Sequence, residues 1–314
     1  MTAAACLIVY GIAVAVLAPR ILVRRTLLDR APTLGVTIWL AAIVGVLTAW
    51  LAAVVLAAVD VLLSPEVRHV VSRCAAFFCA AALGAHGTTG QWWAVGAATT
   101  LVAGTVGATI GLGRALLRAR IRTHRHADDA RLIGHHDDTL GAVILDVPER
   151  LVYAVAGRPP TVVLSRPALF SLDSDQLAVI LAHERAHLAG RHHLVLALSA
   201  ALARIMPRVR LFSTAQSELA RLVEMCADDA AVRDRDARDL LSALMTLSTP
   251  AGIPGSALAA AATGVTDRAE RLASPPDRAA LRRARSLLGA GSVALLAGPA
   301  LVGAAACGVL PSGL

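Results

Sequence analysis

Long uncharged apolar runs alternate with arginine-rich segments along this chain of 314 residues. A helix that crosses a bilayer needs about 20 predominantly apolar residues. Four runs approach or exceed that length: residues 3–18, 35–60, 91–112 and 286–310. The pattern therefore predicts an α-helical membrane protein with four transmembrane helices.

Arginine clusters flank these runs in residues 20–30, 114–125 and 278–285. With four spans, all three clusters fall on one side of the membrane, and the positive-inside rule makes that side the cytoplasm. We therefore expect a membrane region in residues 1–113, a cytoplasmic domain in residues 114–285 and both termini outside. A fifth span through residues 74–86 would break this agreement.

The polar segment between the third and fourth runs has mixed strand and helix patterns. AVILDV (142–147) and LVYAVAG (151–157) flank a Pro-Glu-Arg turn and predict a hairpin, and TVVLS (161–165) predicts a further strand. From Asp173 the pattern is helical, and a glutamine three residues later completes a capping-box sequence. A second helix is expected over residues 214–233. This segment is therefore predicted to be an α+β domain.

The composition supports membrane insertion and argues against nucleic acid as a partner. Mean hydropathy is +0.65, and 56% of the residues are hydrophobic. The net charge is +8, but the chain contains no lysine, and the arginines follow the membrane topology. Aromatic residues make up only 3%, too few to provide a stacking platform for nucleic-acid bases. We expect the lipid bilayer as a partner and no direct nucleic-acid binding.

The segment LAHERAHLAGRHH, residues 181–193, places polar residues at helical spacing in an apolar run. His183 and His187 are four residues apart, so both imidazoles lie on one face of a helix and can bind one metal ion. Catalytic zinc usually takes three protein ligands and one water molecule. Glu184 lies beside these ligands, where a carboxylate takes a proton from the bound water and delivers it to the leaving amine. The alternative is two hydrogen-bonded helix histidines beside a surface glutamate.

The third ligand is expected on a second helix, in EMCADDAA, residues 224–231. Glu224 and Asp228 are again four residues apart on one face. Glu224 is the candidate ligand, and Asp228 is the candidate acceptor for the other ring N–H of a ligating histidine. A solvated helix end is the alternative for the acidic pair at residues 228 and 229.

These two segments, in this order after a strand, resemble the membrane gluzincins. The BlaR/MecR-type antirepressor metallopeptidases are the most similar, with HtpX and Ste24-type proteases as relatives. Their HExxH and ExxxD helices are matched by His183, Glu184, His187, Glu224 and Asp228. The resemblance implies a cytoplasmic zincin-like metallopeptidase domain with one zinc ion. It also implies a protein or peptide substrate, such as a winged-helix repressor of the BlaI/MecI type.

The resemblance departs at the C-terminus, where BlaR/MecR-type receptors carry a penicillin-binding sensor domain. This chain ends four residues after position 310, so we expect no beta-lactam sensing by an attached domain. Two other functions remain open. One is HtpX-like quality control of membrane proteins, and the other is a non-catalytic membrane receptor with structural zinc. Glu184 argues against the receptor, because a purely structural site has no use for that base.

Four further features of the sequence carry predictions of their own. The histidines and aspartates of residues 124–138 have no compact ligand spacing and are expected to form a hydrated segment. His192 is expected to continue the metal helix as a cation at its C-terminal end. Arg271 is a candidate partner for the acidic patch near Asp228. The TVVLS strand is a candidate to hold an extended substrate as an added strand, although an ordinary edge strand fits equally well.

Overall fold

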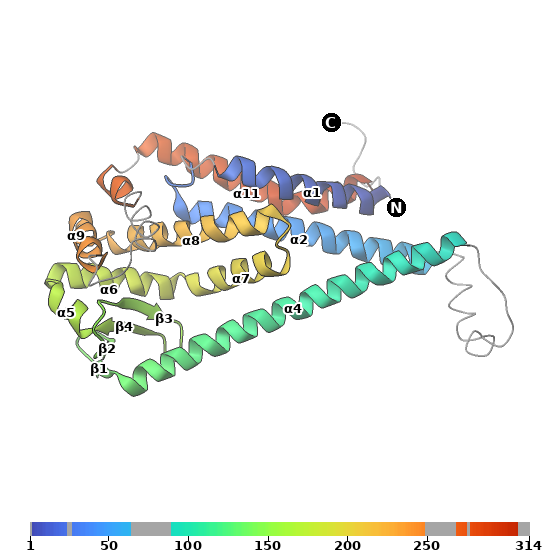
Figure 1. The fold of residues 1–314 in the computed structure, drawn as a ribbon. Helices are drawn as coiled ribbons and strands as arrows, with labels where there is room; N and C mark the ends of the chain where they lie inside the picture. The colour runs from blue at the N-terminus through green and yellow to red at the C-terminus, as the bar shows by residue number, and fades with distance from the viewer. Residues whose placement is uncertain (1, 24–26, 64–88, 249–267, 275–276, 307–314) are drawn as a thin grey trace.

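The computed structural model describes residues 2–23, 27–63, 89–248, 268–274 and 277–306. A helical bundle forms one end of the elongated molecule, and a small sheet with its covering helices forms the other (Figure 1). The short apolar run 74–86 lies outside the described residues.

The bundle consists of α1 (Thr2–Leu22), α2 (Pro32–Leu63) and α11 (Arg278–Ala306). Small residues allow these helices to approach closely, as is common between membrane helices. A Cβ atom at Gly45 on α2 would lie 2.5 Å from the backbone oxygen of Leu295 on α11. The Tyr10 hydroxyl of α1 donates to the same oxygen at 2.9 Å. The first turns of α1 and the last turns of α11 pack together at the end remote from the sheet (Figure 1).

Three of the described helices are long and apolar enough to cross a membrane. They contain Ala3–Leu22, Pro32–Val59 and Arg278–Ala306. The predicted spans 3–18, 35–60 and 286–310 overlap these segments, which supports a membrane protein.

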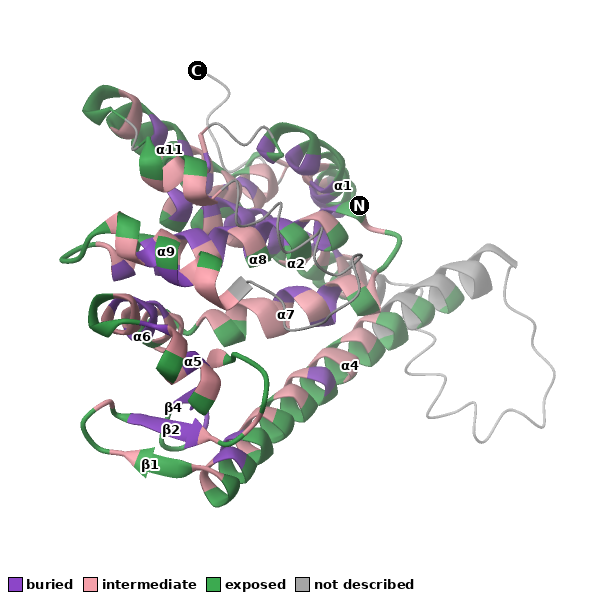
Figure 2. Ribbon diagram, turned by 60° about the vertical axis from the view of Figure 1, so that its left-hand side comes forward, coloured by how far each residue is buried: buried purple, intermediate pink, exposed green. Residues whose placement is uncertain are grey.

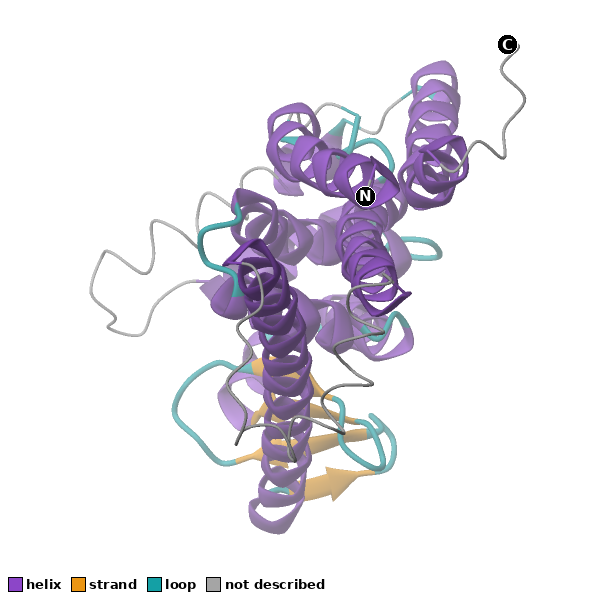
Figure 3. Cartoon of the chain, turned by 90° about the vertical axis from the view of Figure 1, so that its right-hand side faces the viewer, coloured by secondary structure: helices purple, strands orange, loops and turns teal. Residues whose placement is uncertain are grey.

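The predicted count of four spans is not met among the described residues. Residues 91–112 form part of α4 (Thr89–Ile133), a single helix of 45 residues. The arginine-rich residues that follow this apolar run continue the same helix toward the sheet without a break (Figure 3). Side chains at the start of α4 lie outside the description, so the fourth span stays a prediction.

The sheet has four strands in the order β1-β2-β4-β3. Their bounds are β1 His135–Asp137, β2 Ala142–Leu145, β3 Val152–Val155 and β4 Thr161–Ser165. The predicted β2–β3 hairpin is wrong, because β4 lies between these strands, parallel to β2 and antiparallel to β3. All five residues of β4 are buried, whereas β2 and β3 have buried residues at fewer positions. Hydrophobic burial therefore selects β4 as a central strand and leaves β3 at the edge.

Helices cover both faces of this sheet. On one face, Ala127 and Ala130 of α4 pack with Val155 and Val163. On the other face, Leu181 of α6 (Ser174–Ala189) packs against the strands. The predicted capping box is present at the start of α6, where Asp173 accepts from the backbone of the first turn. The packing with the strands therefore places α6 against the sheet, and the capping box defines where the helix begins.

The remaining helices connect the sheet layer to the bundle. They are α5 (Arg166–Ser171), α7 (His192–Ile205), α8 (Arg210–Ala231) and α9 (Ala237–Ser248). The helix predicted over residues 214–233 is α8, which begins four residues earlier and ends two residues earlier. Leu211, Phe212 and Leu222 of α8 share one buried core with Trp39 and Ile43 of α2.

Figure 2 shows buried positions on both α2 and α8, while α4 is exposed over most of its length.

Polar contacts also tie α8 to the loop between α1 and α2. Arg221 of α8 forms an ion pair with Asp29 at 2.5 Å, and Arg271 donates to the Asp29 backbone oxygen at 2.7 Å. The orientation of α8 is therefore fixed by the membrane helices themselves.

Candidate metal centre

The antiparallel helices α6 and α8 bring His183, His187 and Glu224 together. The His183 Nε2 and His187 Nε2 atoms are 3.1 Å apart. Glu224 Oε2 lies 3.6 Å from His183 Nε2, and Glu224 Oε1 lies 3.4 Å from His187 Nε2. Among the described residues, only these three bring three potential ligand atoms within 4.8 Å of one another. The predicted ligand positions therefore converge on one point between the helices.

Glu184 of α6 is half-buried and lies beside the edge strand β3. Burial raises the pKa of its carboxyl group to about 7, and the backbone N–H of Ala154 donates a hydrogen bond to it. A carboxyl group with a pKa near neutrality both accepts and releases protons readily at physiological pH. The side chain predicted as the base is thus positioned beside β3, and burial makes its carboxyl group less acidic.

Asp228 lies directly behind His183, one turn after Glu224 on α8. Asp228 is fully buried, and its Oδ1 atom is 3.1 Å from His183 Nδ1, although without the alignment of a hydrogen bond. Burial lowers the pKa of His183, but the carboxylates of Asp228 and Glu224 outweigh it and raise the pKa to about 9. His183 therefore has its Nε2 atom toward Glu224 and its Nδ1 atom toward Asp228.

The sequence model of peptidase family M48 matches residues 122–288, more than half of the 314 residues. The chain belongs to peptidase family M48. It is therefore a metallopeptidase, and the His-His-Glu group is compatible with the metal dependence of that family. The match supports the expected membrane-type gluzincin, whereas the BlaR/MecR type stays a prediction. Neither the search of curated proteins nor the search of solved structures found a match.

Arg268 is a member of this M48 centre that the sequence patterns did not identify. Its Nε and Nη2 atoms donate to the two carboxylate oxygens of Asp228 at 2.7 and 2.5 Å. Its Nη1 atom lies 3.4 Å from Glu224 Oε2. One guanidinium group therefore bridges the carboxylates that face the two ring nitrogens of His183. A fork-shaped pair of this kind fixes orientation as well as charge.

Arg271 forms the ion pair that was expected near Asp228. Its Nη2 atom donates to both carboxylate oxygens of Asp229, at 2.5 and 2.7 Å. The two arginines lie in one short helical segment, residues 268–273. Arg268 forms an ion pair with Asp228, and Arg271 forms one with the adjacent Asp229. The sequence signal for Arg268 was its spacing of three residues from Arg271, which places both on the same side of a helix.

The prediction for His192 is wrong. The helix α6 ends at Ala189, and Arg191 has a left-handed backbone with φ 49°, so His192 begins a new helix, α7. Its Nδ1 atom lies 2.9 Å from the Nδ1 atom of His187. Burial is the main cause that lowers the pKa of His192, which favours a neutral ring. His192 thus contacts the side of His187 that faces away from Glu224.

The histidines of residues 124–138 remain apart from the metal centre. His124 and His126 belong to α4, and His135 and His136 are exposed on β1. The segment lies at the protein surface with most of its residues exposed or half-buried, in keeping with the hydrated segment that was expected.

Proposed function

We propose that this M48 chain is a membrane-anchored zinc endopeptidase that cleaves cytoplasmic proteins or peptides. The observation that carries the proposal is the convergence of three ligand groups between two helices. Nitrogen and oxygen ligands at about 2.0–2.1 Å from a tetrahedral zinc ion lie roughly 3.3–3.4 Å from one another. In the structure the two histidine Nε2 atoms are 3.1 Å apart, Glu224 Oε1 lies 3.4 Å from His187 Nε2, and the other oxygen, Oε2, lies 3.6 Å from His183 Nε2. The three side chains are therefore close enough to share one zinc ion.

Bound zinc supplies an activated water molecule and polarises the scissile carbonyl. The chain's own contribution begins with Glu184, which takes a proton on its carboxylate and returns it to the leaving amine. Its pKa near 7 suits both steps, since acid–base catalysis is most effective when the pKa is near the working pH. Asp228, itself bonded to Arg268, places its carboxylate 3.1 Å from the Nδ1 atom of His183, and His192 contacts the imidazole of His187.

The edge strand β3 is the proposed support for an extended substrate. The strand predicted for this role, β4, is excluded because it is paired on both sides. In contrast, β3 is paired only with β4 among the described strands, and its residue Ala154 already donates its N–H toward Glu184. A peptide that adds to this edge would lie alongside the proposed base.

The direct test is metal content and proteolysis of the purified full-length chain. One zinc ion per chain is expected by elemental analysis, with cleavage of an unfolded protein such as casein. A chelator should abolish both, and added zinc should restore both. Stoichiometric zinc in a chain that cleaves no peptide bond, under conditions where added zinc saturates the site, would favour the receptor with structural zinc.

The proposed target is a BlaI/MecI-type winged-helix repressor, and HtpX-like quality control of membrane proteins is the alternative. The proposed cytoplasmic side is supported by the described arginines at position 20 and in residues 114–125 and 278–285, which lie on the parts of α1, α4 and α11 toward the sheet. Comparison of the proteomes of cells that carry wild-type protein or Glu184→Gln distinguishes the targets. A single repressor cleaved only by the wild type supports regulation, while many stabilised membrane proteins in the variant would support quality control.

A further inference from the structure

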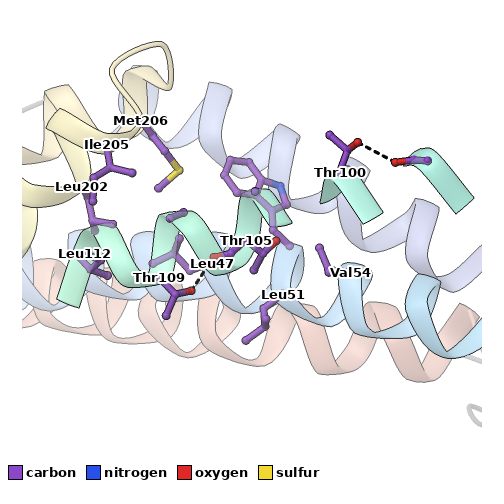
Figure 4. Close-up of a pocket in the computed structure, with 14 residues that line it drawn as sticks. Leu47, Leu51, Val54, Thr100, Thr105, Thr109, Leu112, Leu202, Ile205 and Met206 are labelled. Carbon is purple, nitrogen blue, oxygen red and sulfur yellow. Dashed lines mark hydrogen bonds between the residues drawn. The ribbon is translucent and has the colours of Figure 1, made fainter. Parts of the chain in front are cut away.

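Two cavities follow one another along the seam between α4 and α7, and neither is lined by His183, His187 or Glu224. The first has a volume of about 930 Å³ and lies between α2, the apolar half of α4 and the last turn of α7. The side chains that line it include Leu47, Leu112, Ile205 and Met206 (Figure 4). It carries no charged side chain among its lining residues.

The threonines of this apolar cavity do not add hydrogen-bonding capacity for a polar ligand. The Thr100 hydroxyl donates to the Gly96 oxygen, and the Thr109 hydroxyl donates to the Thr105 oxygen, each at 2.8 Å within α4 (Figure 4). Threonine hydroxyls satisfied by their own helix are compatible with a hydrocarbon environment. The apolar cavity therefore favours a hydrocarbon occupant.

The second cavity has a volume of about 810 Å³ and lies where α4 becomes rich in arginine. Its walls carry Arg120 of α4, Arg158 of the β3–β4 loop and Arg191 at the start of α7. No carboxylate lines it, and none of the three guanidinium groups has an ion pair or side-chain hydrogen bond with another described residue. The N-terminus of α7 at this cavity also lacks a side-chain cap. This cationic cavity therefore favours an anion.

The two cavities are neighbours along the same pair of helices. The apolar cavity ends at Leu112 on α4, and the cationic cavity begins at Leu116, one helical turn further. On α7 the order along the chain is the opposite: the earlier residue Leu198 lines the cationic cavity, and the later residue Leu202 lines the apolar cavity. An occupant of both must therefore have an apolar part on the membrane side and an anionic part on the arginine-rich side.

The length of the apolar cavity suits an acyl chain. Its lining residues on α4 extend from Gly96 to Leu112, about 24 Å at 1.5 Å per residue. This length exceeds the roughly 15 Å of hydrocarbon in one leaflet. An acyl chain therefore fits along the apolar cavity, and the adjoining arginines match the charge of a phosphate headgroup.

We propose that the α4–α7 seam binds an anionic phospholipid, with an acyl chain in the apolar cavity and the phosphate among Arg120, Arg158 and Arg191. The proposal does not depend on the peptidase activity or on the metal. It assigns a lipid site to a surface that the proposed catalytic function does not use. Each arginine near a membrane surface contributes roughly fivefold to the binding of anionic lipid.

The first test removes the positive charges of the cationic cavity. The wild-type chain in detergent, titrated with phosphatidylglycerol and followed by native mass spectrometry, should bind this lipid more tightly than phosphatidylcholine. The triple variant Arg120→Gln, Arg158→Gln, Arg191→Gln should bind phosphatidylglycerol roughly 100-fold more weakly. The matched control is Arg118→Gln, Arg122→Gln, Arg125→Gln, which removes the same charge from exposed positions of α4 outside the cavity.

The second test fills the apolar cavity. Gly104 and Gly107 both lie on the apolar half of α4, and a Cβ atom at either would meet no other atom within 4 Å. Of these two glycines, only Gly104 lines the cavity. Gly104→Leu should therefore weaken phosphatidylglycerol binding at least tenfold, while Gly107→Leu should retain it. Because both substitutions add the same side chain to open space, a difference between them cannot arise from helix propensity.

The outcomes separate the lipid from other anions. Equal losses in the two arginine triples, or no preference for phosphatidylglycerol over phosphatidylcholine, would overturn the site. Inorganic phosphate that binds as tightly as the lipid would show an anion site without an acyl chain. A polyglutamate peptide that depends on the three arginines when the lipid does not would assign the cavity to a protein ligand.

Discussion

The metal centre and the α4–α7 seam differ in whether their charged side chains have partners of opposite charge. At the metal centre, Asp228 is fully buried and Arg268 contacts both Asp228 and Glu224. In the cationic cavity, the guanidinium groups of Arg120 and Arg158 have no carboxylate partner among the described residues. A buried charge without a partner costs several kcal/mol, whereas an exposed one remains solvated. The chain therefore neutralises the buried charges of the candidate metal centre internally and leaves the seam's charges available to an external anion.

This difference predicts how each region responds when a charged side chain is removed. In the metal centre, each residue is needed by its neighbours, so a single substitution should affect metal, activity or stability. In the seam, a substitution should change only the binding of a molecule from outside. The following predictions test this contrast.

The largest effect is expected from Glu184→Gln. The amide cannot accept the proton from water, so the rate of peptide hydrolysis should fall about 10²- to 10⁴-fold. The metal should remain, because Glu184 is not among the three converging ligand positions. Hydrolysis of a fluorogenic peptide and elemental analysis of the same sample measure both quantities. Activity within threefold of the wild type would remove Glu184 from the role of base.

Glu224→Ala should release the metal. Only the two imidazoles would remain, and the loss of zinc affinity should exceed the roughly 10- to 100-fold that is typical of residues outside the ligand set. Glu270→Ala is the control, because it also removes a glutamate side chain, but from an exposed position in the neighbouring 268–273 segment. Competition with a zinc indicator measures the affinity. Normal zinc affinity in Glu224→Ala would show that this carboxylate is not a ligand.

The sequence predicted those parts of the centre that depend on local helix geometry. Residues four apart lie on one helix face whatever surrounds them, so the pairs at 183 and 187 and at 224 and 228 could be placed in advance. The start of α6 was also predicted, because the capping box at Asp173 is a local signal. The convergence of the two helices followed from the family resemblance, which joined the two segments in one site.

Long-range packing explains what the sequence did not predict. The β2–β3 hairpin was wrong because β4, later in the chain, occupies the place between these strands. Arg268 was missed because its contact with Asp228 spans 40 residues of sequence. The break before His192 depends on the left-handed backbone of Arg191, a conformation that non-glycine residues adopt rarely. The seam depends on how α4 packs against α7, which no local pattern specifies.

Substitutions of Arg268 and Arg271 are expected to have effects of intermediate size on stability and zinc affinity, and the two can be compared directly. Arg268→Ala would leave Asp228 buried without its guanidinium partner, so we expect a loss of about 3 kcal/mol in stability and roughly 10- to 100-fold weaker zinc binding. Arg271→Ala should cost about 1 kcal/mol or less, because its partner Asp229 is half-exposed. Thermal unfolding in detergent and zinc titration of both variants test the comparison. Equal effects would contradict the positioning role of Arg268.

The smallest effect is expected on stability when the seam loses its arginines. In detergent without anionic lipid, Arg120→Gln, Arg158→Gln and Arg191→Gln should each change the unfolding free energy by about 0.5 kcal/mol or less, because each is exposed and unpaired among the described residues. With phosphatidylglycerol at 100 times its dissociation constant, a single lipid site should stabilise the wild type by about 2.7 kcal/mol. The triple variant should lose most of that gain. If the triple variant unfolds at a much lower temperature even without lipid, the seam's charges contribute to folding, and its contrast with the metal centre disappears.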